Sequence, residues 1–193
     1  MFLPKYLAAV SCFMLWTTTI QASPIIYAGA LTSGVTVTGS NSQPSGSEDN
    51  PVGAEYYSFT ATAGDTIDIF GDRLVGGYDM SFWVLDGVYT DTTEIIGGSF
   101  PGTQALFSRF GDDEDPPNIA GSFGDPHETF VAPFTGSYTV AVTNFASAVA
   151  GPYPFELTMV AVPEPTTLGV LSIGAIGMVA RAARRRRQRK PDA

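Results

Sequence analysis

The chain has 193 residues, a formal net charge of −9 and a single cysteine, Cys12. Residues 24–161 carry 17 acidic and two basic side chains, a net charge of −15, which excludes nucleic acid as a partner because two polyanions repel each other. Residues 24–161 contain no cysteine and therefore no disulfide. The stability of this segment must come from a packed core or from bound metal. Its 138 residues suffice for one domain.

The first 22 residues have the pattern of a secretory signal peptide. Lys5 supplies a positive charge, residues 6–16 are almost entirely apolar, and a short polar stretch leads to Ala22. We therefore expect signal peptidase to cleave after Ala22. Ser23 and Ala30 stay as alternative cleavage positions, because the third residue before the first cut is larger than usual.

Residues 24–161 predict an all-β domain. Short runs of alternating apolar and polar residues are separated by turns rich in Gly and Pro, and no segment has helical periodicity. About eight strands would form an antiparallel two-sheet sandwich. The firm strands are residues 25–31, 34–38, 56–62, 66–70, 78–85, 128–132, 138–143 and 155–160, and the weak ones are residues 93–96 and 105–107.

The strongest local pattern predicts a hairpin. Residues 56–62 and 66–70 alternate regularly on either side of a turn at Ala63-Gly64-Asp65. Tyr57 and Phe59 would then face the isoleucines of the second strand across the pair.

Several segments of this domain together resemble the bacterial pre-peptidase C-terminal domain over residues 48–160. They are Tyr56-Tyr57-Ser58-Phe59-Thr60-Ala61-Thr62-Ala63-Gly64-Asp65-Thr66-Ile67, Asp79-Met80-Ser81-Phe82-Trp83-Val84-Leu85-Asp86-Gly87, Gly111-Asp112-Asp113, Phe130-Val131-Ala132-Pro133 and Gly136-Ser137-Tyr138-Thr139-Val140-Ala141-Val142. The resemblance implies a jelly-roll sandwich. An insertion between Asp86 and Gly111 departs from the family pattern.

The acidic residues are candidate calcium ligands, because calcium takes six to eight oxygen atoms from carboxylates, amides and carbonyls. In calcium-binding members of the resembled family, the ligands come from an acidic stretch before the domain and from acids near the central strand. By position, that resemblance implies Glu48, Asp49, Asn50, Asp72 and Asp79. The alternative is that exposed acids only keep an exported domain soluble.

The sequence lacks the common motifs of catalytic sites. His127 is the only histidine, and there is no Gly-x-Ser-x-Gly motif, so a nucleophilic triad and an ordinary zinc site are both missing. Paired carboxylates could hydrolyse glycosides. Aromatic residues such as Trp83 could form a sugar platform, although rings on strands usually pack in the core.

The end of the chain reads as a sorting signal. Residues 166–180 are uncharged and, as a helix, would span about 22 Å, short of the roughly 30 Å of a bilayer core. The basic residues that follow would stay on the cytoplasmic side by the positive-inside rule. They are Arg181, Arg184, Arg185, Arg186, Arg187, Arg189 and Lys190.

Together with Val162, Pro163, Glu164 and Pro165, this ending resembles the PEP-CTERM sorting signal over residues 162–190. The resemblance implies a single transmembrane helix with transient membrane residence, and cleavage by an exosortase-type membrane protease. We therefore expect an inner-membrane precursor that is delivered to the cell envelope, the surface or the exterior.

Three hypotheses follow for residues 24–161. The first is a noncatalytic envelope or extracellular-matrix protein associated with extracellular polysaccharide. The second is a calcium-dependent module that binds carbohydrate or protein. The third is a glycosidase.

Overall fold

The computed structural model describes residues 23–95 and 107–164. Within these ranges the chain forms nine β-strands and no helix. The strands are β1 (Tyr27–Ala30), β2 (Val35–Asn41), β3 (Glu55–Ala61), β4 (Thr66–Arg73), β5 (Tyr78–Asp86), β6 (Ser108–Gly111), β7 (His127–Val131), β8 (Gly136–Ser147) and β9 (Tyr153–Val162).

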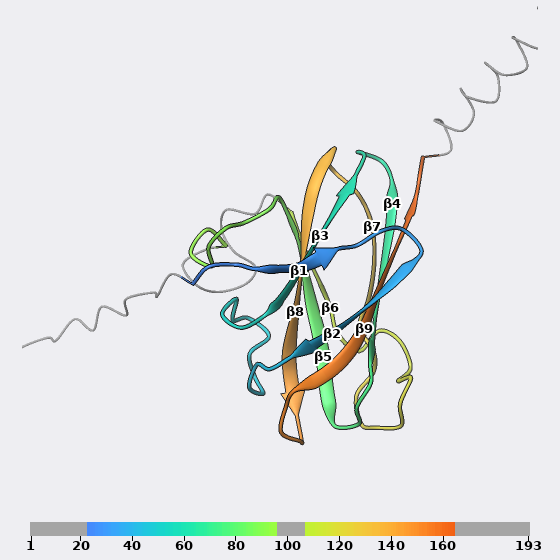
Figure 1. Cartoon of the computed structure of the whole chain (residues 1–193). Helices are drawn as coiled ribbons and strands as arrows, with labels where there is room; N and C mark the ends of the chain where they lie inside the picture. The colour runs from blue at the N-terminus through green and yellow to red at the C-terminus, as the bar shows by residue number, and fades with distance from the viewer. Residues whose placement is uncertain (1–22, 96–106, 165–193) are drawn as a thin grey trace, which may run out of the picture.

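The strands form two sheets that pack face to face (Figure 1). The five-stranded sheet has the order β1-β3-β8-β5-β6 and the four-stranded sheet has the order β2-β9-β4-β7. All neighbours are antiparallel except β1 and β3. Without β1, this is the strand order of a jelly roll built from two Greek keys, so the predicted all-β sandwich is confirmed.

The core follows from the two-residue period of the strands. On β4, Ile67 and Ile69 are fully buried, while Asp68 between them points outward. On β9, alternate apolar residues face the same core. Tyr78 and Tyr153 stack across the two sheets with ring centroids 4.6 Å apart. Burial of such side chains supplies most of the folding free energy.

The predicted hairpin of residues 56–62 and 66–70 is wrong in its pairing. Strand β3 pairs with β1 and β8, while β4 pairs with β7 and β9 in the other sheet. The turn at Ala63-Gly64-Asp65 does connect the two strands, but it carries the chain from one sheet to the other. Their apolar faces therefore meet across the core rather than side by side, and alternation alone does not distinguish these two arrangements.

One of the two weaker strand predictions is wrong, and the other is largely untested. Residues 92–95 form turns instead of the strand expected at 93–96. The strand expected at 105–107 lies mostly outside the described residues, and the observed strand β6 begins at Ser108. Its pairing with β5, Phe82 opposite Gly111, places it at the edge of the five-stranded sheet.

The terminal signals fall largely beyond the part of the chain that the structure describes. The predicted signal peptide up to Ala22, Pro165, the span at residues 166–180 and the basic cluster all lie outside it. In the described ranges, no helix is long and apolar enough to cross a membrane. Strand β9 continues to Val162, the first residue of the predicted sorting motif.

Candidate functional site

Asp79 reaches a buried position through the alternation of β5. Its neighbours Tyr78 and Met80 point into the core, so Asp79 points to the outer face of the five-stranded sheet. Part of this outer face is covered by the loop between β2 and β3. Trp83 on β5 donates its indole N–H to the carbonyl of Glu48 at 2.8 Å. Asp79 is consequently only 3% exposed.

Asp112 and Asp113 come to Asp79 through the pairing of β6. Strand β6 runs antiparallel to β5 and ends at Gly111, opposite Phe82, so the next residues continue toward the start of β5. One carboxylate oxygen from each of Asp79, Asp112 and Asp113 lies within 4.8 Å of the other two. We call these three residues the acidic cluster.

Several oxygen atoms in and beside the acidic cluster lack a hydrogen-bond donor. Among the described residues, Asp79 Oδ1, Asp112 Oδ1 and Glu48 Oε2 are buried without a partner. A buried carboxylate oxygen without a partner is costly, because it loses its hydration and gains nothing in return. Such atoms are what a bound cation would satisfy.

The charges of the acidic cluster oppose one another. Burial, followed by repulsion from Asp112 and Asp113, raises the pKa of Asp79 to about 7, although Arg73 opposes the shift. Burial and repulsion from Asp113, Glu114 and Glu48 raise the pKa of Asp112 to about 6. Like charges at this separation cannot all ionise easily without a counter-ion.

The acidic cluster fits a hard divalent cation. Its donors are all carboxylate oxygens, which calcium, magnesium and manganese prefer over softer ligands. Asp113 is exposed at the rim, so solvent or a second ligand can reach the cluster from that side. Glu48 lies close enough to influence both Asp79 and Asp112 electrostatically and can supply a fourth carboxylate.

The five predicted ligand residues lie in three places. Glu48 and Asp79 lie at the acidic cluster. Asp49 is exposed in the same loop, and the side-chain oxygen of Asn50 accepts the amide of Val52 at 2.9 Å.

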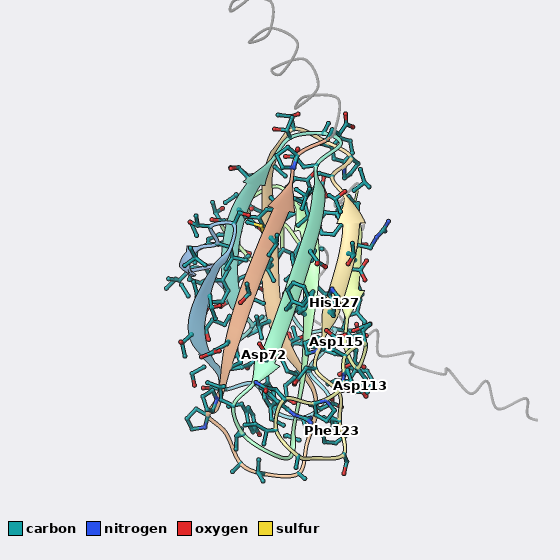
Figure 2. The ribbon with its side chains drawn as sticks, turned by 90° about the vertical axis from the view of Figure 1, so that its right-hand side faces the viewer. Asp72, Asp113, Asp115, Phe123 and His127 are labelled. Atoms are coloured by element: carbon teal, nitrogen blue, oxygen red, sulfur yellow. The ribbon has the colours of Figure 1, made fainter. Side chains whose placement is uncertain are left out.

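Asp72 is not brought to Asp79. It lies on the outer face of β4 in the four-stranded sheet, where Figure 2 shows it. Burial and the charges of Asp125, Glu156 and Asp115 raise its pKa.

Asp112 and Asp113 were not among the ligands that the sequence predicted. The missing information was the register of β6, a four-residue strand next to a Gly-rich insertion. Once Gly111 is placed opposite Phe82, the two aspartates follow by extension of the ladder.

His127 lies on the four-stranded sheet, where β7 begins (Figure 2). Its Nε2 is 2.6 Å from Asp68 Oδ1, and its Nδ1 is 3.1 Å from Asp115 Oδ2. Burial alone would lower the pKa of His127, but hydrogen bonds to Asp68 and Asp115 outweigh it and raise the pKa. Both ring nitrogens are therefore engaged by carboxylates.

The aromatic residues pack mainly inside the sandwich. Tyr57, Tyr78 and Tyr138 are at most 2% exposed, and Phe59 stacks on Tyr138 at 5.1 Å. Trp83 is partly covered and packs against Phe110. These rings form core contacts, as is usual for rings on strands.

The fold and the acidic cluster define a small jelly-roll domain with a candidate cation site. Residues 161–187 match the family described as PEP-CTERM protein-sorting motif, which confirms the predicted ending. The chain is therefore an exported protein that is sorted through its C-terminal signal and processed by an exosortase. No curated protein matches it significantly.

Three solved structures are similar in fold. The first is CorA, a surface-associated copper-binding protein of Methylomicrobium album BG8 (13% identity, 71% of this chain, 98% of that chain, TM-score 0.49). The second is the pre-peptidase C-terminal domain of a Bacillus anthracis collagenase (15% identity, 71% of this chain, 99% of that chain, TM-score 0.40). The third is the secreted Methylococcus capsulatus protein MopE (11% identity, 70% of this chain, 87% of that chain, TM-score 0.45). All three TM-scores are below 0.5, so these likenesses do not bear on the function of this chain.

Proposed function

We propose that the exported domain is a noncatalytic, calcium-binding module of the cell envelope or extracellular matrix. The cation binds at the acidic cluster, with Asp79, Asp112 and Asp113 as ligands and Glu48 beside them. The observation that carries this proposal is Asp79 Oδ1, a buried oxygen without a hydrogen-bond partner, within 4.8 Å of two further carboxylates.

Calcium is favoured over softer metals by the ligands on offer. Copper sites in proteins use imidazole or sulfur ligands, whereas carboxylate and carbonyl oxygens suit calcium, magnesium and manganese. The one histidine of this chain is engaged by Asp68 and Asp115 on the four-stranded sheet. The acidic cluster itself offers oxygen atoms only.

A noncatalytic role is supported by the same two sites. A general base needs a free ring nitrogen or a carboxylate that faces a substrate, and neither ring nitrogen of His127 is free of a carboxylate partner. At the acidic cluster, Asp79 is almost fully buried, so it cannot reach a glycosidic bond.

Cation titration of purified residues 23–164, which include every described strand, tests the proposal. We expect calcium to bind with measurable heat and to raise the melting temperature by about 5–10 °C at a hundredfold excess over Kd, with EDTA reversing the gain. Magnesium and copper(II) serve as comparison ions. Binding of copper alone, or no shift with any ion, would contradict the proposal.

A matched pair of substitutions locates the cation. Asp112→Asn removes one ligand charge without changing the shape of the side chain, so we expect calcium affinity to fall at least about tenfold. Asp72→Asn, on the outer face of the other sheet, should leave affinity unchanged. Equal losses in the two variants would place the cation elsewhere.

Extracellular polysaccharide is the partner that we propose for this module. Asp113 is exposed, so a bound calcium ion would keep coordination positions open toward sugar hydroxyl groups. A glycan array probed with and without calcium checks this. We expect calcium-dependent signals, whereas hydrolysis of an arrayed glycan would favour the glycosidase hypothesis.

A further inference from the structure

The folded sheet runs directly into the sorting signal. Val162 is still paired with Thr66 of β4, and the amide of Ala161 donates to Ser33 Oγ at 2.9 Å. The matched sorting segment begins at residue 161, so the strand and the signal overlap. Because Glu164 follows the last paired residue by two positions, it can lie at most about 7 Å of chain away from the sheet.

Glu164 rests against the turn between β3 and β4. The side-chain Cγ of Glu164 lies 2.7 Å from where a Cβ on Gly64 would be, and its carboxylate would overlap that atom. Glycine at this position leaves the space that the Glu164 side chain occupies, and an added Cβ would force that side chain to shift. In Figure 1 the end of β3, the start of β4 and the end of β9 lie at one end of the sandwich.

The turn that receives Glu164 is fixed to the rest of the domain. The amide of Gly64 donates to the carbonyl of Ala132 at 2.9 Å, and the amide of Ala132 donates to the carbonyl of Asp65 at 2.8 Å. The carboxylate of Asp65 also accepts the amide of Thr62 at 2.8 Å. Glu164 thus rests on a braced surface, while its own side chain stays exposed.

We infer that the turn at residues 62–65 is a seat that positions Glu164 for the sorting protease. The membrane protease that reads the motif approaches this end of the sandwich and meets Glu164 in one orientation, held by the folded domain. Recognition then depends on the turn as well as on the motif. Gly64 is a positioning residue for a reaction that occurs at the sorting signal.

Substitution of Gly64 tests the seat. Gly64 has φ = +94°, a backbone conformation that asparagine tolerates better than other residues with side chains. In Gly64→Asn the new side chain would displace Glu164. Gly46→Asn is the matched control, because Gly46 has φ = +75° with nothing within 4 Å of an added Cβ.

The readout is the half-time for conversion of full-length precursor to mature protein in a bacterium that has the processing protease. We expect Gly64→Asn to slow conversion about tenfold, since small displacements of a reacting group are costly, and Gly46→Asn to have no effect. Limited proteolysis of each variant precursor reports whether its sandwich domain is folded. Equal or faster conversion of a folded Gly64→Asn precursor would overturn the inference.

A second variant keeps the test decisive if Gly64→Asn does not fold. Three residues, Gly-Ser-Gly, inserted between Ala161 and Val162 leave the turn and the four-residue motif intact but separate them. We expect slow conversion of this variant as well. Conversion at the rate of the unmodified protein would show that the motif is read without the domain, which overturns the seat.

Discussion

At the scale of single residues, Asp79 has the most informative environment. Its oxygen atoms face two other aspartates and a glutamate, yet hardly any of its surface meets water. An isolated domain tolerates this by keeping a proton on the carboxylate, and a cation would replace that proton. Stability and metal binding are therefore both linked to pH at this residue.

Without cation, the domain should lose stability as pH rises from about 4 to 7. The pKa of Asp79 rises from 3.8 when unfolded to about 7 when folded, so in this window the folded state binds more protons than the unfolded state. The free energy of unfolding therefore falls as the pH rises through this window. We expect Asp79 to contribute about 1–2 kcal/mol, less than its whole shift would imply, because the acidic cluster opens to solvent at Asp113.

Urea unfolding in EDTA at several pH values measures this effect. The variant Asp79→Asn cannot titrate, so its difference from the unmodified protein isolates Asp79 from groups such as His127. Saturating calcium should reduce the fall, because the cation binds the ionised form. A difference that does not change with pH would show that Asp79 has an ordinary pKa.

At the scale of elements, one buried arginine joins the loop between β6 and β7 to the two sheets. The Arg73 side chain, at the end of β4, is fully buried and lies 3.6 Å from Asp125 Oδ1 through its Nε. Its other nitrogens donate to the carbonyls of Tyr78, Ile119 and Phe123. Strand β4, the start of β5 and the loop are thus joined at one point.

Removal of this arginine should destabilise the domain strongly. In Arg73→Met, Asp125 stays buried without its charge partner, so we expect a loss of about 3–5 kcal/mol in the free energy of unfolding. The control is Arg109→Met, whose arginine is half exposed and 3.4 Å from Glu128, for which we expect a loss of at most about 1 kcal/mol. Urea unfolding of both variants checks this, and similar losses would contradict the role given to Arg73.

Elements with strong alternation could be predicted from the sequence, while their partners could not. Strand β9 and the apolar faces of β3 and β4 follow from the period of two, because each buries one face. The placement of β3 and β4 in different sheets depends on contacts with β8 and β9, far along the chain. Asp79 was selected as a ligand, but Asp112 and Asp113 needed the register of β6, which no local pattern gives.

At the scale of the whole molecule, the acidic cluster and the sorting signal lie at opposite ends of the sandwich. Asp79 pairs with Ala146 near the end of β8, whereas Val162 pairs with Thr66 at the start of β4. The eight residues of β4 span about 23 Å between these ends. The acidic cluster therefore lies at the end of the sandwich that is far from Val162, where the sorting signal begins.

The two forms of the protein should accordingly bind calcium alike. We expect the Kd of precursor in lipid vesicles to agree within about twofold with the Kd of the mature domain, because the bilayer lies beyond the Debye length from the acidic cluster. Isothermal titration of both forms measures this. A precursor that binds much more weakly would indicate that the acidic cluster is covered before processing.

The position of β9 sets the order in which this protein can mature. Strand β9 is the last of the described strands to be synthesised, yet it lies inside its sheet, between β2 and β4. Until it arrives, β2 has no partner in that sheet and one edge of β4 stays open. The sandwich can therefore close only after β9 has been exported, directly before the sorting motif follows it.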